Sequence, residues 1–309
     1  MSLEEIIQEG DTVILYFAMT NISLIDKITM DGTTHNACGF FHHSDIIGKP
    51  FGAKIHPRLR SEYPRPLHAM KPTPELFTLS IPHRTQIIYH ADISMIMMAL
   101  NILPGSTVAE AGTGSASLSY SIGYTIGERG RLHTFEVDPH RAHHNRQLLA
   151  NVLPTDVVTV SERDVIVDGF PQEIRVDAVF LDLPSPWLAI PSAATILTEN
   201  GRLCTFSPSI EQVSKNVSAL VENGFHEIKT VEVMLKPWGL DIPREAQIGE
   251  KRKQSPMDED ALMRSFQLPM RGHTSYLTFA IKKLRDEDEY PLSVLSVSNV
   301  SMSAKARKE

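Results

Sequence analysis

The stretch Val108-Ala109-Glu110-Ala111-Gly112-Thr113-Gly114-Ser115 decides the fold of this chain. A hydrophobic run ends in an acidic residue, a glycine-rich turn follows at once, and residues 116–127 suit a helix. A strand, a tight turn and a helix in this order form a nucleotide-type binding crevice. The glycines let the backbone approach a ligand closely, because they carry no Cβ.

Two ligands compete for such a turn. A dinucleotide-binding turn reads G-x-G-x-x-G and places a phosphate at the helix N-terminus, but here the third glycine position holds Ser117. Glu110 would also repel a pyrophosphate, whereas its carboxylate suits the sulfonium and ammonium groups of S-adenosylmethionine. A strand-to-helix turn without a ligand stays open at this point, because short motifs also match by chance.

Composition narrows the class of protein. The chain has 309 residues, 42% of them hydrophobic and 22% charged, which is typical of a soluble protein with one large domain or two smaller ones. We expect no membrane span, no signal peptide and no metal site, because the apolar runs are short, the first residues are acidic and the histidines lack ligand spacing. Cys38 and Cys204 need not pair, which favours a reducing compartment.

Charge adds a constraint on the partners. The formal net charge of −7 argues against a freestanding nucleic-acid binder, which would usually be basic. It does not exclude a nucleic-acid enzyme whose positive surface is local or is supplied by a partner. Two short basic runs, Lys251-Arg252-Lys253 and Lys305-Ala306-Arg307-Lys308, suit nuclear import as well as a solvated tail. We expect the nucleus, with the cytoplasm as the alternative.

The predicted pattern of secondary structure changes near residue 76. Residues 1–76 show short extended pieces with frequent turns, which predicts a small N-terminal β-barrel or sandwich, and prolines at 64–74 predict a linker. Residues 77–285 alternate strands and helices, which predicts an α/β domain with a mostly parallel, Rossmann-like sheet. We expect residues 236–270 to be a polar, partly disordered insertion and 286–309 a flexible tail. The predicted strands are 107–110, 131–137, 157–160, 178–181, 202–206, 230–235 and 275–281, and the predicted helices are 93–103, 116–127, 141–152, 188–197 and 210–223.

Acidic residues follow the predicted strands at the edge where such sheets bind ligands. Glu136 lies about twenty residues past the glycine turn, the spacing of an acid that binds ribose hydroxyls. Asp164 suits either an adenine amino group or a helix N-cap. Asp182 follows a buried strand and precedes two prolines, and a lone carboxylate at a buried strand end favours a function over a cap. Upstream, Gln86 and Tyr89 share a face if helical, although these residues alone favour a plain polar lead into a helix.

Five motifs together resemble the catalytic subunit of the eukaryotic tRNA (adenine-N1) methyltransferase, which modifies the T-loop adenine at tRNA position 58. The resemblance runs from near the first residue to about residue 282 and omits the charged insertion and the tail. Its motifs are Pro104-Gly105-x-x-Val108-x-Glu110-x-Gly112-Thr113-Gly114-Ser115, His133-Thr134-x-Glu136, Phe180-Leu181-Asp182-Leu183-Pro184-Ser185-Pro186-Trp187, Ser207-Pro208-x-Ile210-Glu211-Gln212-Val213 and Gly272-His273-Thr274-x-Tyr276-Leu277-Thr278-Phe279-Ala280. The block from Pro82-His83-Arg84-Thr85-Gln86 to Tyr89 also matches.

The resemblance implies a β-barrel followed by a seven-strand Rossmann-like methyltransferase domain that binds S-adenosylmethionine. It implies Asp182 and Tyr89 as catalytic residues, and a two-plus-two heterotetramer with a related non-catalytic subunit on a tRNA substrate. The sequence departs from the family at Ala111 and Ala116, where relatives often carry serine and glycine. The expected cofactor-binding residues are Gln86, Glu110, Ala111, Gly112, Thr113, Gly114, Ser115, Glu136, Arg141, Asp164, Val165 and Asp182.

The expected reaction is in-line transfer of the sulfonium methyl to adenine N1. Methylation makes the ring cationic, so Asp182 beside the exocyclic amino group would stabilise charge that grows toward the transition state. Two alternatives stay open: a methyltransferase that acts on another substrate class, and a non-catalytic tRNA-binding assembly subunit.

Overall fold

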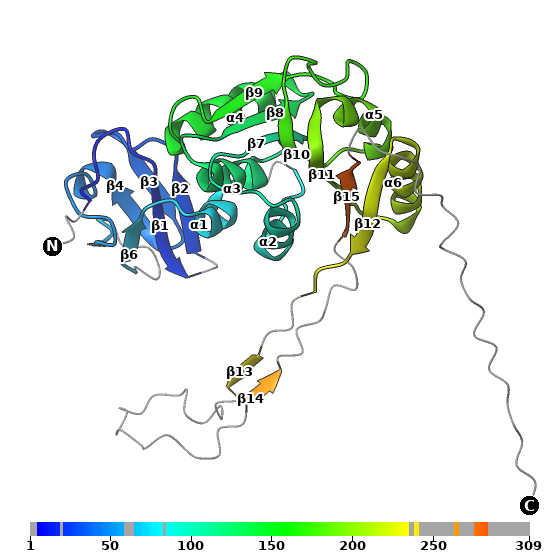
Figure 1. Ribbon diagram of the computed structural model, residues 1–309. Helices are drawn as coiled ribbons and strands as arrows, with labels where there is room; N and C mark the ends of the chain where they lie inside the picture. The colour runs from blue at the N-terminus through cyan, green and yellow to red at the C-terminus, as the bar shows by residue number, and fades with distance from the viewer. Residues whose placement is uncertain are drawn as a thin grey trace, which may run out of the picture.

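A seven-stranded sheet forms the centre of the computed structural model, which describes residues 5–18, 21–58, 65–82, 85–234, 238–240, 263–265 and 275–283. The strand order is β12-β15-β11-β10-β7-β8-β9. Six of these strands run in the same direction, and β15 runs opposite to them. Figure 1 shows the strands side by side with helices on both faces. The strands are β7 Thr107–Ala111, β8 Arg131–Glu136, β9 Val158–Glu162, β10 Val176–Leu181, β11 Leu197–Ser207, β12 Phe225–Val231 and β15 Tyr276–Lys282.

In the described part of the chain, six α-helices accompany the strands. Apolar side chains alternate along the central strands, so that Val108 and Phe180 pack toward α2 and α3 while Ala109 and Val179 pack toward α5. Both faces of the sheet are therefore buried, as expected for parallel strands with crossover helices. The helices are α1 Pro74–Ser80, α2 His90–Ala99, α3 Ser117–Ile126, α4 Pro139–Val152, α5 Pro186–Ile196 and α6 Ile210–Glu222.

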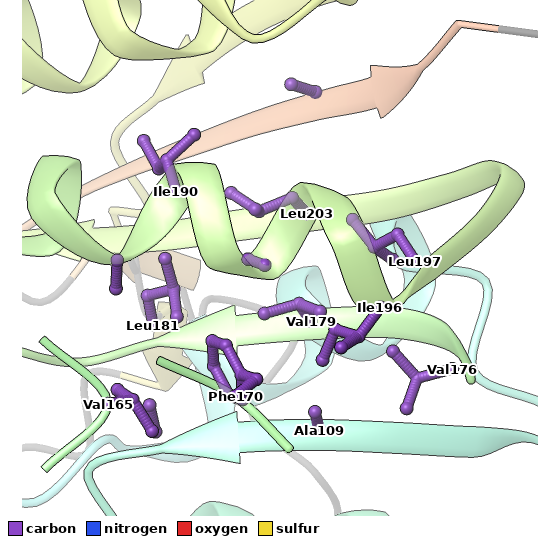
Figure 2. Close-up of a cluster of buried hydrophobic side chains, with 14 of the residues drawn as sticks. Ala109, Val165, Phe170, Val176, Val179, Leu181, Ile190, Ile196, Leu197 and Leu203 are labelled. Atoms are coloured by element: carbon purple, nitrogen blue, oxygen red, sulfur yellow. The ribbon is translucent and has the colours of Figure 1, made fainter. Parts of the chain in front are cut away.

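The hydrophobic core beneath α5 fixes β10, the strand that Asp182 directly follows. Figure 2 shows Ile190 and Ile196 of α5 in one cluster with Val179 and Leu181 of β10 and with Phe170. These side chains are almost fully buried. Burying each large aliphatic side chain contributes about 1.5–3 kcal/mol, which holds the end of β10 rigidly.

Strand register brings the predicted acids together. Ala111, the last residue of β7, pairs with Leu181 of β10 on one side and with Phe135 of β8 on the other. The residues that follow these pairs, Gly112, Asp182 and Glu136, therefore leave the sheet at one edge. The prediction of a mostly parallel, Rossmann-like sheet is confirmed.

The N-terminal strands are antiparallel and fit the predicted small barrel-like part. A four-stranded sheet of order β2-β1-β6-β5 and a β3–β4 hairpin enclose a separate apolar core that includes Leu15, Phe41 and Ile55. The elements are β1 Val13–Ala18, β2 Asn21–Ile25, β3 Thr33–Asn36, β4 Gly39–His42, the 3-10 helix η1 His43–Asp45, β5 Lys54–Ile55 and β6 Leu67–Met70.

Part of the predicted linker at 64–74 is wrong. β6 lies within it and pairs with β1, with Ile14 opposite Met70. Leu67 and Ala69 are fully buried in the N-terminal core, so alternating burial rather than the flanking prolines decides the structure here. α1 straddles residue 76, where the sequence places the domain boundary, and that division stays a prediction.

Element ends differ from the predictions by a few residues. α2 ends at Ala99 rather than near 103, because Asn101 takes a positive φ of 54° and stops the helix. β12 starts at Phe225 rather than 230, directly after Gly224 turns with φ of 76°. Of the predicted insertion, the described part beyond residue 237 is the β13 (Trp238–Leu240) and β14 (Met263–Ser265) pair, and the predicted tail lies outside the described residues. Among the described helices, none has the length and apolarity to cross a bilayer.

Candidate active site

A cavity of about 390 Å³ opens at the carboxyl edge of the sheet. It lies where the chain leaves β7, β8, β9 and β10, which is where open α/β sheets bind their ligands. Its volume falls in the range of about 300–1,000 Å³ that is usual for small-molecule sites. The lining residues are Thr85, Gln86, Gly112, Gly114, Phe135, Glu136, Val137, Arg141, Arg163, Asp164, Val165, Ile166, Asp182, Leu183 and Pro184.

The glycine turn fits against the neighbouring strand end with no room for side chains. Gly112 has φ of 92°, and a Cβ there would overlap the backbone carbonyl oxygen of Asp182. The Asp182 N–H donates to the Ala111 carbonyl at 2.9 Å, so the two strand ends are bonded as well as packed. Gly114 is also tight, since a Cβ would lie 2.9 Å from Thr85 Oγ1.

Glu136 ties the turn to the next helix. Its Oε2 accepts from the Gly114 N–H at 3.0 Å, and its Oε1 accepts from the Asp138 N–H at 3.0 Å and from Arg141 Nη2 at 2.7 Å. A carboxylate offers about four acceptor positions. Three of these positions are occupied, so one acceptor position of Glu136 remains for the predicted ribose hydroxyl. A second becomes available if Arg141 turns away. Arg141 Nε is buried and has no partner among the described residues, so this guanidinium keeps a donor in reserve beside the cavity.

Glu110 does not line the cavity. Its side chain is 1% exposed, and its Oε2 accepts from Ser119 Oγ of α3 at 2.5 Å. Burial raises the pKa of Glu110 to about 7, against the opposing effect of hydrogen bonds from Ser119 and Thr134. The expectation that this carboxylate faces a cationic ligand is therefore corrected: it supports the turn from beneath, because the strand carries it inward rather than out of the edge.

Asp182 faces the cavity from the end of β10. Its residue is partly buried, and α5 begins at Pro186 with Ser185 at the N-cap position, so Asp182 does not cap that helix. Burial, and then the nearby carboxylate of Glu136, raises the pKa of Asp182 to about 6. The group is thus ionised at neutral pH but costly to keep so, as expected of a carboxylate that awaits a cationic or hydrogen-donating ligand.

Asp164 combines a local turn contact with a place in the cavity lining, and it does not cap a helix. Its Oδ1 accepts from the Ile166 N–H at 2.9 Å and caps a local turn, while the residue also lines the cavity. Val165 next to it is 2% exposed and packs in the core under α5. The second carboxylate oxygen of Asp164 remains for a ligand.

The structure gathers eight of the predicted residues around one cavity and leaves five outside its lining. Ala111, Thr113 and Ser115 are buried in or behind the turn, and Ser115 Oγ contacts Thr85 Oγ1 at 3.0 Å. Tyr89 is 43% exposed at the N-cap of α2. His83, Arg84 and Gly272-His273-Thr274 of the matching motifs lie outside the described residues. The eight that line the cavity are Gln86, Gly112, Gly114, Glu136, Arg141, Asp164, Val165 and Asp182.

Several lining residues escaped the sequence prediction. Phe135, Val137, Arg163, Leu183 and Pro184 are chain neighbours of the predicted acids. Their position in the sequence could have identified them, because residues next to an acid at a ligand-binding strand end also reach the cavity.

Strand order, glycine turn and acid-lined cavity define a Rossmann-like protein of the methyltransferase type. Residues 66–259 match the family described as tRNA methyltransferase complex GCD14 subunit. The chain belongs to this family, which confirms the resemblance found in the sequence.

Named relatives agree. The tRNA (adenine(58)-N(1))-methyltransferase catalytic subunit TRM61 of Cryptococcus neoformans is 42% identical over 241 residues, which are 77% of this chain and 54% of that protein. The chain thus matches about half of the length of this relative. The trmt61a catalytic subunit of Dictyostelium discoideum is 34% identical over 305 residues, 89% of this chain and 96% of the relative.

Solved structures support the fold. A SAM-dependent O-methyltransferase of Thermotoga maritima has a TM-score of 0.72 and 26% identity, covering 92% of this chain and 97% of its own. The tRNA (m1A58) methyltransferase TrmI of Aquifex aeolicus has a TM-score of 0.64 and 24% identity, covering 90% and 99%.

Proposed function

We propose that this chain is the catalytic subunit of a tRNA (adenine(58)-N1) methyltransferase. The observation that carries the proposal is the position of Asp182, whose carboxylate faces the cofactor-sized cavity directly beside the glycine turn. The family and the named relatives point to the same activity.

The cavity fits S-adenosylmethionine. Glycines at 112 and 114 leave the backbone bare where a cofactor would press against the turn, and Glu136 keeps an acceptor position for ribose. The same cavity is also lined by polar side chains that can bind the cofactor, namely Asp164, Gln86 and Arg141. S-adenosylmethionine supplies an activated methyl group on a positively charged sulfur. The carboxylates of Glu136, Asp164 and Asp182 in the cavity lining favour that charge.

Asp182 then performs the electrostatic part of the reaction. Its carboxylate accepts a hydrogen bond from the exocyclic amino group of an adenine that has left its stack. As N1 gains the methyl group, positive charge spreads over the ring and toward that amino group, so the contact strengthens toward the transition state. Positioning of the base against the cavity supplies most of the remaining acceleration.

Replacing the acid tests the assignment. We expect Asp182→Ala to keep the fold and to lose at least about a hundredfold in methylation rate, the scale of removing one electrostatic stabiliser. Thermal melting and S-adenosylmethionine affinity are measured on the same preparation. Near-normal turnover of a folded Asp182→Ala variant would refute the role of this residue.

The assembly belongs to the same proposal. A related non-catalytic subunit pairs with this chain in a two-plus-two heterotetramer and holds much of the tRNA, which the chain's net charge of −7 favours. Co-expression with a candidate partner, native mass spectrometry, and mapping of the methylated base on tRNA test this directly. Methylation of a base other than the T-loop adenine contradicts the substrate assignment.

Nuclear localisation is likewise proposed, with the two short basic runs as its support. Imaging of a fluorescent fusion, with and without substitution of Lys251-Arg252-Lys253, tests it.

A silent assembly subunit is the alternative from another class. Retention of a cofactor-sized cavity together with Glu136, Asp164 and Asp182 argues against it. Thermal stabilisation by S-adenosylmethionine separates the two, because a ligand that binds only the folded state raises its melting temperature.

A further inference from the structure

Helix α6 reaches across to the loop that carries Asp182. Gln212, in the first turn of α6, donates from Nε2 to the Pro184 carbonyl oxygen at 3.2 Å. One turn further along the same helix face, Lys215 places its Nζ 4.5 Å from the centre of the Trp187 ring, a cation–π contact. Figure 1 shows α6 and α5 next to each other on the same side of the sheet.

The contact of Gln212 is costly to the helix. Ser209-Ile210-Glu211-Gln212 has the sequence of a capping box, in which the side chain at the fourth position accepts from the N-cap N–H. The first half of the box is present, because Ser209 Oγ accepts from the Gln212 N–H at 3.4 Å. The second half is not: Gln212 Oε1 is buried without a partner among the described residues, and the amide points its donor at Pro184 instead.

The orientation of this amide is fixed by chemistry. Turning it over would place Oε1 against the Pro184 carbonyl oxygen, so that two acceptors would face each other. A buried carbonyl without a partner lowers stability, so the contact with the loop comes at the expense of the helix. That exchange is expected of a functional contact rather than of one that stabilises the fold.

The loop needs such a support. The Asp182 N–H is bonded to Ala111 at the end of β10, and α5 begins at Pro186, so residues 183–185 bridge two fixed points. Leu183 and Pro184 line the cavity together with Asp182. A shift of Pro184 would move the wall against which the target base packs and would turn the Asp182 carboxylate with it.

We propose that Gln212 is a positioning residue, which holds the Pro184 carbonyl and thereby sets the Asp182 carboxylate for methyl transfer. This inference rests on the proposed function for its catalytic consequence, but the loop contact itself does not. Gln212 does not line the cavity. Its effect on the site passes through Pro184, so we expect the rate to change more than cofactor affinity.

Gln212→Glu gives the sharpest test, because it moves stability and rate in opposite directions. A glutamate at this helix position completes the capping box and favours the helix dipole. The same carboxylate cannot donate to Pro184. We expect an unchanged or higher melting temperature, an S-adenosylmethionine affinity that changes less than kcat, and a kcat lowered about tenfold or more, since a misplacement of about 1 Å can cost a hundredfold.

Two further variants keep the test decisive. Gln212→Met removes the donor without adding charge and is expected to lower kcat as well. Ser214→Glu adds the same charge at an exposed position of α6 and is expected to leave kcat unchanged. All variants are assayed as the full chain co-purified with its partner subunit on tRNA.

Hydrogen exchange supplies a readout that does not depend on activity. We expect amides of residues 183–188 to exchange faster in both Gln212 variants, with β10 and the rest of α6 unchanged. Wild-type kcat or unchanged exchange in both variants overturns the positioning role. A wild-type complex that fails to methylate tRNA contradicts the proposed function instead, and the exchange data still decide the loop contact.

Discussion

At the scale of single residues, the site is an arrangement of acids that differ in their surroundings. Glu110 is buried beneath the turn, Glu136 accepts three hydrogen bonds and keeps one acceptor position, and Asp182 faces the cavity. The three carboxyl groups sit close enough that each opposes the ionisation of a neighbour, as the pKa of Glu110, raised by burial and then by Asp182 and Glu136, illustrates. A cationic ligand relieves this repulsion, which is a physical reason for the site to select one.

The raised pKa of Asp182 predicts the pH dependence of methylation. Burial, followed by the Glu136 charge, raises its pKa to about 6, and only the ionised form can stabilise the cationic product. We expect kcat/KM, which follows the free enzyme, to be constant above that pKa and to fall about tenfold per pH unit below it. Initial rates between about pH 5 and pH 9 measure the profile.

Asp182→Asn serves as the comparison for this profile. The asparagine does not titrate, so the acid limb should vanish from its low residual rate. A limb that persists in the variant assigns the titration to another group, and a flat wild-type profile down to about pH 5 contradicts the assignment to Asp182.

Gly112 offers a test of the close approach at the turn. Gly112→Ala forces a side chain onto φ of 92° and drives its Cβ into the Asp182 carbonyl, so β7 and β10 must separate at the cavity. We expect loss of S-adenosylmethionine binding and a marked fall in melting temperature, measured by calorimetry and thermal denaturation.

Gly105→Ala is the matched control. Its φ is 91°, but a Cβ there meets nothing within 4 Å, so it carries only the left-handed strain of about 1–2 kcal/mol. Equal effects of the two substitutions would mean that strain alone, and not the contact with Asp182, restricts position 112.

At the scale of elements, the regular part of the chain was predictable and the irregular part was not. Alternating apolar strands and helices predicted all seven strands of the main sheet, because burial on both faces leaves a strong pattern. Of the N-terminal strands, β2, β3 and β6 were missed: they have only four or five residues each, β3 is half exposed, and β6 follows prolines that suggest a linker. Short strands draw their stability from partners far along the chain, which local sequence does not show.

The site shows the same division. The acids at strand ends could be placed from the sequence, because strand ends of a parallel sheet share one edge. The depth of each side chain could not, since Glu110 turns inward from the strand while Asp182, one residue past the end of its strand, faces the cavity. The Gln212 contact was hidden for another reason: its sequence predicts a capping box, and only the packing of α5 against α6 redirects the amide.

Helix α4 links local capping to cofactor binding. Asp138 caps the helix by accepting from the Arg141 N–H at 2.8 Å, and its other oxygen lies 3.5 Å from Arg141 Nη1. We expect Asp138→Ala to destabilise the protein by about 1 kcal/mol, the usual worth of an N-cap. It should also weaken S-adenosylmethionine binding, because Arg141 and Glu136 then lose their fixed geometry.

Thr73→Ala removes a cap from α1, where Thr73 accepts from the Leu76 N–H and does not line the cavity. It should cost similar stability without changing cofactor affinity. The role of Asp138 in the site is disproved if thermal melts and titration calorimetry show the same pair of effects for both variants.

At the scale of the whole molecule, the negative net charge of the chain opposes binding of a tRNA substrate, and the proposed partner subunit resolves this opposition. A chain of net charge −7 repels a polyanion on balance, while the proposed reaction needs an adenine brought to Asp182 in the cavity. We expect the isolated chain to bind tRNA poorly, and the complex with its partner subunit to bind it tightly with a steep dependence on salt.

Titrations of labelled tRNA with the isolated chain and with the complex, at several salt concentrations, measure both the affinity and its salt dependence. The slope of log K against log salt reports the number of phosphates neutralised, and the proposal places most of that number on the partner. Asp182→Ala should leave the slope of the complex unchanged, because the acid contacts a base and not a phosphate. Tight, salt-sensitive binding by the isolated chain would mean that its own basic side chains suffice, and the partner would then have to act on the chemistry rather than on the substrate.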